Sequence, residues 1–163
     1  MTALRPATEA DIPHILRLVR GLAEYEKLAD KMVATEADFR TLMFGSAPRA
    51  HAILAEPAGQ APVGIALYYY TISSFSGRPG IFLKDLFVEP SHRGTGLGLA
   101  LLGRLAAIAV EENCVSIDWR VLEWNTPAID FYESLGATRM TEWHVRQLNG
   151  DALMALAKGH SHG

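Results

Sequence analysis

The most constraining feature of the sequence is a glycine-rich turn between an apolar run and an amphipathic helix, within residues 85–105. The first backbone N–H groups of a helix have no intrahelical partner, and the helix dipole favours negative charge beside them. Glycine has no Cβ, so Gly94, Gly96 and Gly98 allow a bulky anion to approach those groups closely. The turn therefore predicts a binding site for a pyrophosphate, although such a turn also occurs as ordinary structure.

Two common phosphate loops do not fit this turn. A P-loop requires Lys followed by Ser or Thr after its last glycine, but Leu99 and Ala100 follow Gly98. A dinucleotide fingerprint requires G-x-G-x-x-G early in a βαβ unit, whereas the spacing here is G-x-G-x-G and lies late in the chain. The remaining pattern is R-x-x-G-x-G, which begins at Arg93 after a predicted strand that ends at Val88.

A second motif, N-x-x-A-x-x-F-Y-x-x-x-G, begins at Asn125. A helix is predicted over residues 126–135, because Pro127 suits a first turn and Gly136 suits the position after a helix. Asn125 then lies at the start of this helix, where its amide can bind a ligand, and Tyr132 follows two turns later. Tyr132 on its own could also be a core residue.

The two motifs, in this order, resemble those of the GNAT N-acetyltransferases. Further stretches resemble the diamine acetyltransferase branch, which includes spermidine/spermine and thialysine acetyltransferases: residues 4–8, 22–26, 67–70, 86–88 and 123–125. The resemblance implies a single α/β domain with a mixed, mostly antiparallel sheet and helices on both faces. It also implies acetyl-CoA as co-substrate and a homodimer. We expect the domain to cover residues 1–158 and a flexible tail to cover 159–163.

The resemblance also implies roles for individual residues. Tyr132 would be the general acid that protonates the departing thiolate of coenzyme A. A backbone N–H near Phe87 or Val88 would stabilise the charge that develops on the carbonyl oxygen. The expected cofactor contacts are Leu86, Phe87, Val88, Arg93, Gly94, Thr95, Gly96, Leu97, Gly98, Leu99, Asn125, Thr126, Pro127 and Ala128. No metal ligands are expected, since no cluster has structural-zinc spacing.

The acceptor implied by the resemblance is a primary amine of a small molecule: a diamine, a polyamine or an amino-acid-like compound such as thialysine. The expected acceptor contacts are Tyr25, Glu26, Lys84, Asp118, Trp119, Arg120 and His144. An alkyl ammonium must lose a proton before it can attack, and Glu26, Asp118 and His144 are unranked candidates to assist. A protein lysine or N-terminus as acceptor, and a non-catalytic acyl-CoA sensor, are the alternative interpretations.

The sequence departs from the polyamine enzymes at two places. Lys84 stands where they carry an acid, and residues 73–75 lack the acid and tryptophan expected in the preceding loop. Like charges a few ångström apart near a protein surface repel by about 1 kcal/mol or more. Lys84 and Arg120 therefore favour an acceptor that carries a carboxylate beside its amine.

Composition and sequence pattern give no indication of a nucleic-acid-binding, membrane-spanning or secreted protein. The 163 residues suit one domain, and a net charge of −3 gives no electrostatic reason to expect nucleic acid. No apolar run reaches the roughly 18 residues of a membrane span, and the N-terminus has no signal-peptide pattern, so a cytoplasmic location is expected. Cys114 is interpreted as a buried spectator. His160 and His162 are interpreted as part of a flexible end rather than a metal site.

Turn and capping signals predict the remaining elements. Thr8 with Asp11, and Thr35 with Asp38, resemble capping boxes that start two helices. A third helix is predicted over residues 97–112. Strands are expected at 3–5, 50–54, 63–72, 81–88 and 115–121, and Asn149-Gly150 predicts a hairpin between 143–148 and 152–156.

Overall fold

A computed structural model describes residues 1–159 of the chain, which divides into two compact units, Met1–Leu122 and Glu123–Gly163. The elements of the first unit are β1 (Thr2–Pro6), α1 (Ile12–Tyr25), α2 (Glu36–Phe44), β2 (His51–Pro57), β3 (Gly64–Ser73), β4 (Arg78–Val88), α3 (Leu97–Glu111) and β5 (Ile117–Asp118). Short 3₁₀ turns occur at Glu9–Asp11, Ala29–Lys31 and Pro90–His92. The second unit contains α4 (Thr126–Ser134) and α5 (Gly150–Gly159).

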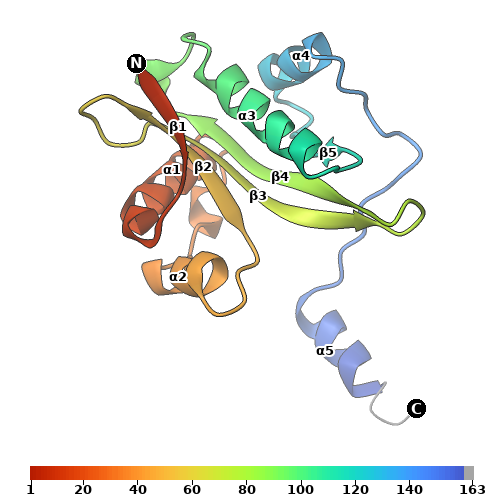
Figure 1. Cartoon of the computed structure of the whole chain (residues 1–163). Coiled ribbons are helices and arrows are strands. Elements are labelled where there is room, and N and C mark those ends of the chain that lie inside the picture. Colours follow the sequence, from red (N-terminus) through yellow and green to blue (C-terminus); the bar gives the residue numbers. More distant parts are fainter. Residues whose placement is uncertain (160–163) are drawn as a thin grey trace. The chain divides into compact units, whose positions relative to one another are not determined.

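The five strands form one sheet in the order β1-β2-β3-β4-β5. The first four strands pair antiparallel, and β5 pairs parallel to β4 through Ile81 with Ile117 and Phe82 with Asp118. Within this unit, α1 and α2 cover one face of the sheet and α3 covers the other (Figure 1). The predicted mixed, mostly antiparallel sheet with helices on both faces is confirmed.

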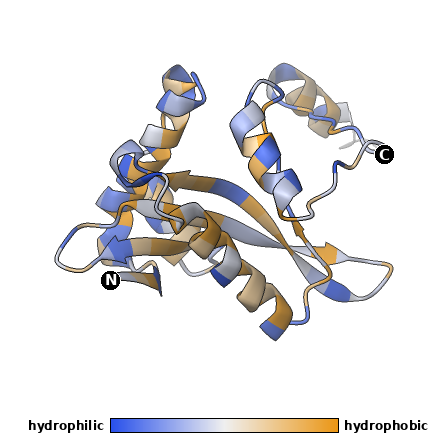
Figure 2. Ribbon diagram, turned by 90° about the horizontal axis from the view of Figure 1, so that it is seen from above, coloured by the Kyte–Doolittle hydropathy of each residue, from blue (hydrophilic) through white to orange (hydrophobic). Residues whose placement is uncertain are grey.

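The core of the first unit lies on both faces of the central strands, where Figure 2 shows hydrophobic residues concentrated. On the α1 face, Ile12, Ile15 and Leu18 are fully buried in a cluster that also contains Leu67 and Phe87. On the other face, α3 packs on β2, β3 and β4. No helix within residues 1–159 is long and apolar enough to cross a membrane.

Both predicted capping boxes form. The backbone N–H of Thr8 donates to Asp11 Oδ2 at 2.8 Å, and the Thr8 hydroxyl donates to the same oxygen at 3.1 Å. The backbone N–H of Asp38 donates to Thr35 Oγ1 at 3.2 Å, while Thr35 N–H donates back to Asp38 Oδ2 at 2.8 Å. These contacts satisfy N–H groups that the helix itself leaves without partners, which fixes where the chain enters α1 and α2.

A β-bulge interrupts β4 at Lys84. Leu67 lies opposite Asp85, but the next residue, Tyr68, lies opposite Leu83, so Lys84 is an extra residue. Residues directly opposite in an antiparallel pair share a face of the sheet. Since Leu67 belongs to the cluster beneath α1, Asp85 lies on the α1 face, whereas strict alternation would have given Asp85 and Leu83 the same face.

The predicted C-terminal hairpin is wrong. Residues 143–148 form no strand, and the second predicted strand lies within helix α5. A type I′ turn requires positive φ at both central residues, but only Gly150 has it, at 54°. The segment DALMALAK consists largely of strong helix formers, which explains the helix.

The strand predicted over 115–121 is also shorter than expected, because β5 pairs with β4 through only two residue pairs. His160 and His162 lie outside the described residues.

Candidate functional site

The glycine-rich turn forms the left-handed arch that a close approach to the backbone requires. Gly94 and Gly96 have φ of 74° and 83°, and Gly96 immediately precedes α3. A Cβ added at Gly94, Gly96 or Gly98 would meet no atom within 4 Å. The first N–H groups of the 15-residue helix α3 therefore border open space, and alternating left-handed glycines favour an anion-binding concavity.

Arg93, an exposed residue, contacts the segments on either side of this arch. Its Nε donates to the carbonyl oxygen of Val88 at 3.0 Å, and its guanidinium Cζ lies 4.9 Å from the ring centroid of Tyr25 and 5.4 Å from that of Phe87. The Thr95 hydroxyl donates to the carbonyl of His92 at 2.6 Å. Arg93, expected as a cofactor contact, thus joins the end of β4 to the end of α1.

The end of β4 has one backbone edge without a strand partner among the described residues. Beyond Phe82, β5 no longer pairs with β4, while β3 continues along the opposite edge as far as Val88. Leu86 and Phe87 therefore lie on an edge that can donate and accept hydrogen bonds. The Val88 carbonyl already accepts a bond from Arg93.

Three charged side chains gather at the bulge. Burial raises the pKa of Asp85 to about 6; the neighbouring Lys84 ammonium opposes this rise, and Glu26 adds to it. Burial also raises the pKa of Glu26, and Lys84 lowers it. Glu26 and Lys84 were predicted from the sequence, but Asp85 was not. The only indication in the sequence is that Asp85 lies beside Lys84. The alternation of apolar and polar residues along the strand does not reveal the bulge.

The aromatic pair Tyr69 and Phe82 extends the α1 face beyond the bulge. Their rings stack with centroids 5.1 Å apart, and the Arg120 guanidinium lies 5.6 Å from the Phe82 centroid. The Ser116 hydroxyl donates to Asp118 at 3.4 Å, and Trp119 is half-buried. Arg120, two residues after β5, thus adds a second cation over Phe82, which precedes the bulge on β4.

In the second unit, the helix predicted after Asn125 forms as α4. Asn125 is buried and directly precedes α4, and its carbonyl accepts the Ile129 N–H at 3.0 Å. Tyr132 lies two turns into α4, half-buried, with its ring centroid 5.5 Å from that of Phe131. His144 is exposed in a segment without regular structure.

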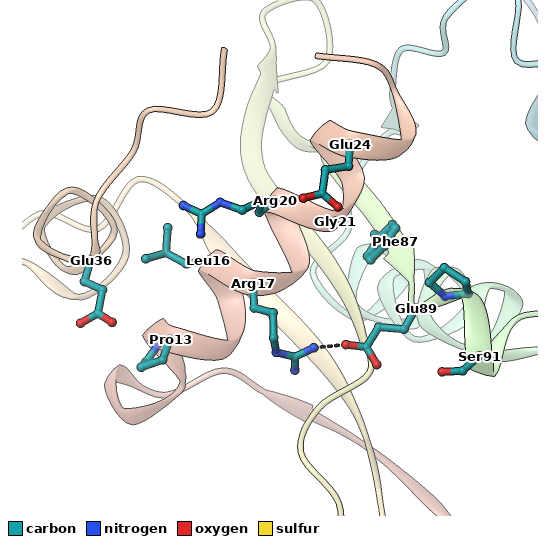
Figure 3. A pocket seen from close by; sticks show the side chains of 11 residues that line it. Pro13, Leu16, Arg17, Arg20, Gly21, Glu24, Glu36, Phe87, Glu89 and Ser91 are labelled. Atoms are coloured by element: carbon teal, nitrogen blue, oxygen red, sulfur yellow. Dashed lines mark hydrogen bonds and ion pairs between the residues drawn. The ribbon is translucent and has the colours of Figure 1, made fainter. Parts of the chain in front are cut away.

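A pocket of about 650 Å³ lies between α1 and the end of β4. Of the predicted contacts only Phe87 lines it, so it was not anticipated from the sequence. Figure 3 shows Arg17 of α1 paired with Glu89, which directly follows β4. Arg17 also donates to the Pro62 carbonyl at 2.7 Å, and the Glu89 N–H donates to Val63 at 2.8 Å. These bonds fix the chain where it leaves β4 for the arch.

Within the first unit, the expected contact Tyr25 therefore lies against Arg93 of the arch, Glu26 interacts with Lys84 at the bulge, and Arg120 lies over Phe82. Residues 1–159 contain no group of three or more His, Cys, Asp or Glu side chains arranged to hold a metal ion.

Comparisons with known proteins agree with this architecture. A model of the acetyltransferase (GNAT) family matches residues 17–137. The thialysine N-epsilon-acetyltransferase of Bos taurus is 40% identical over 164 residues, which cover 94% of this chain and 96% of the relative. The L-ornithine N5-acetyltransferase NATA1 of Arabidopsis thaliana is 27% identical, with coverage of 95% and 87%.

Among solved structures, an integron cassette protein from the mobile metagenome of V. cholerae has a TM-score of 0.81 at 28% identity, covering 96% of this chain and 98% of that one. The relatives match nearly the whole chain, and the family model includes both the arch and the motif that begins at Asn125. This chain belongs to the acetyltransferase (GNAT) family.

Proposed function

We propose that this acetyltransferase uses acetyl-CoA and acetylates the side-chain amine of a small molecule that also carries a carboxylate. The observation that carries the proposal is the left-handed arch of Gly94 and Gly96, which borders open space directly before the N-terminus of α3. The diphosphate of acetyl-CoA is the anion for which such a site is suited. When bound, acetyl-CoA supplies the acetyl group as a thioester.

Different residues of the chain bind the cofactor, orient the acetyl group and transfer the proton. Backbone N–H groups from Gly94 to Leu99 hold the diphosphate, and the open edge at Leu86 and Phe87 binds the arm and orients the acetyl group. Asn125 to Ala128 add contacts to the arm. Tyr132 holds the proton that the departing thiolate takes up. The motif that begins at Asn125 and the family match support these roles.

Charge at the bulge supports an amino-acid-like acceptor. Glu26 and Asp85 attract an ammonium, whereas Lys84 and Arg120 attract a carboxylate. Thialysine and ornithine, named for two relatives, each carry a side-chain amine and one carboxylate. A polyamine has no group to pair with the two cations.

Matched acceptors test the proposal. Thiol release from acetyl-CoA is measured with ornithine against putrescine and with lysine against cadaverine, since each pair differs only by a carboxylate; thialysine and spermidine complete the panel. We expect the amino acids to have the higher kcat/KM, and Lys84→Glu to reduce that preference. Higher kcat/KM for spermidine than for every amino acid would refute the acceptor class. Calorimetry that detects no binding of acetyl-CoA would refute the proposal as a whole.

We also propose that the protein forms a homodimer through its C-terminal segment. Leu153, Met154 and Leu156 of α5 are each about half exposed, and Trp143 is three-quarters exposed. Large apolar side chains exposed on one helix favour association. Light scattering of the full chain and of Trp143→Ser/Leu153→Ser tests this, with a dimer expected for the first and a monomer for the second. A monomeric full chain would contradict it.

A further inference from the structure

The carboxyl of Asp85 has an unusual position for an acidic residue in a sheet. The bulge at Lys84 places Asp85 on the α1 face, opposite the buried Leu67 and two residues before Phe87 of the core cluster. If the strand alternated strictly through Lys84, Asp85 would lie on the same face as Leu83, away from α1. A local irregularity of the strand therefore positions this carboxyl, and bulges of this kind re-aim side chains next to active sites.

The charges around Asp85 come from neighbouring elements. Lys84 precedes it on β4, and Glu26, directly after α1, acts on it electrostatically. On the strand β5, Asp118 accepts a hydrogen bond from Ser116, and the Arg120 guanidinium beyond it lies over Phe82. On α3, Arg104 pairs with Glu111 at 3.6 Å, and β3 contributes the apolar Leu67. The Lys84 cation thus lowers the pKa of Asp85, whereas the Glu26 anion raises it.

This environment keeps the group ready to take a proton near neutral pH. Burial raises the pKa of Asp85 to about 6, and a general base works best when its pKa lies near the operating pH. An ordinary surface aspartate, with a pKa near 4, is a far weaker proton acceptor. The carboxylates of Glu26 and Asp85 both attract an ammonium group to the bulge.

We propose that Asp85 is the catalytic residue that removes the proton from the acceptor's ammonium group, and that Lys84 and Glu26 tune it. This inference rests on the proposed function above. The ammonium gives one proton to Asp85, and the nitrogen lone pair then forms the C–N bond. The C–S bond breaks with its electron pair going to sulfur, which gains a proton as the nitrogen loses its second one. One proton per turnover passes from Asp85 to solvent.

The pH dependence of Asp85→Asn tests the proposal directly. For the wild type, with the best acceptor among thialysine, ornithine and lysine, kcat/KM should rise through about pH 6 and then level off. The variant should lose about 100-fold at pH 7, a typical loss for general-base catalysis, and continue to rise with pH as the amine deprotonates in solution. Asp30→Asn, an exposed carboxylate after α1, is the matched control and should retain the wild-type profile.

Two further variants keep the test valid if Asp85→Asn folds poorly. Lys84→Met removes the cation that lowers the pKa of Asp85, so the acid limb should move to higher pH. Glu26→Gln removes the anion that raises it, so the limb should move to lower pH. Opposite shifts support Asp85. Loss of the limb in Glu26→Gln, or unmoved limbs in both variants, would overturn the assignment.

A stability measurement provides a readout independent of turnover. The pKa of Asp85 is raised in the folded state, so the folded protein loses stability as pH rises from about 4 to about 6. Asp85→Asn should therefore have a higher denaturation midpoint than the wild type at pH 7.5 and a similar one at pH 4. An Asp85→Asn protein that turns over amines with the wild-type profile would refute this role and leave the acetyltransferase function intact. A wild type that binds no acetyl-CoA and acetylates no amine would refute both.

Discussion

The guanidinium of Arg93 lies over the ring of Tyr25, 4.9 Å from its centroid, and so connects the phosphate arch to the end of α1. The family resemblance implied that Arg93 is a cofactor contact and Tyr25 an acceptor contact. In the structure they contact each other, and Arg93 also holds the Val88 carbonyl. A change at Arg93 should therefore affect the shape of the arch.

We expect Arg93→Lys to weaken acetyl-CoA binding although the charge is kept. Lysine cannot reproduce both the Nε bond to Val88 and the stacking over Tyr25, which together contribute about 1–2 kcal/mol at an exposed site. Titration calorimetry should show a Kd for acetyl-CoA roughly tenfold higher. Arg49→Lys, another exposed arginine, is the control, and equal Kd values for both variants would contradict the bracing role.

Substitutions at two glycines of α3 allow the effect on helix stability to be measured separately from the effect on acetyl-CoA binding. Gly98→Ala and Gly103→Ala each place a methyl group in open space on a helix, so each should stabilise the fold by about 0.5–1 kcal/mol. Only Gly98 borders the arch, so only Gly98→Ala should weaken acetyl-CoA binding. Thermal denaturation and calorimetry on the same two proteins measure both effects. Equal affinity in the two variants would place the diphosphate elsewhere.

Tyr132→Phe should lower kcat by about 100-fold or more while the KM for acetyl-CoA changes little, because the hydroxyl is proposed to act only as a proton donor. The aromatic contact with Phe131 does not need the hydroxyl, so the fold should be kept. Steady-state kinetics with the best acceptor checks this. An unchanged kcat would remove Tyr132 from the mechanism.

Acid should weaken the fold through Asp11. Two hydrogen bonds from Arg5, at 2.8 and 2.9 Å, are the main reason that the pKa of Asp11 is lowered from 3.8 to about 2. A carboxyl whose pKa is lower in the folded state stabilises the fold fully above pH 4, and that stabilisation disappears as pH falls toward 2. The side chain is only 8% exposed, so the contribution at neutral pH is about 2 kcal/mol.

Urea denaturation at several pH values measures this contribution. Asp11→Asn should unfold more easily than the wild type at pH 7, and the difference should vanish near pH 2. Glu9→Gln is the control: its ion pair with Arg40 is exposed on both sides and should change stability by less than about 0.5 kcal/mol. A difference between wild type and Asp11→Asn that does not depend on pH would contradict the linkage.

Local features whose physical cause lies within a few residues could be predicted from the amino-acid sequence. Thr8 and Thr35 mark helix entry because each capping partner is three positions away, and Gly96 marks the left-handed residue before α3. The order of strands and helices up to residue 111 also followed from periodicity. At Asn149-Gly150 local reasoning failed, because the residues that follow favour a helix over pairing as a strand.

Contacts between residues far apart in the chain could not be predicted in this way. The bulge at Lys84 is defined by the pairing of β4 with β3, and no pattern within β4 reveals which face Asp85 will take. The pKa of Asp85 depends on burial beneath α1 and on Glu26, almost sixty residues earlier in the chain. Capping and helix periodicity act between neighbours, whereas strand register and desolvation depend on the packed sheet, which is why the sequence alone did not point to Asp85.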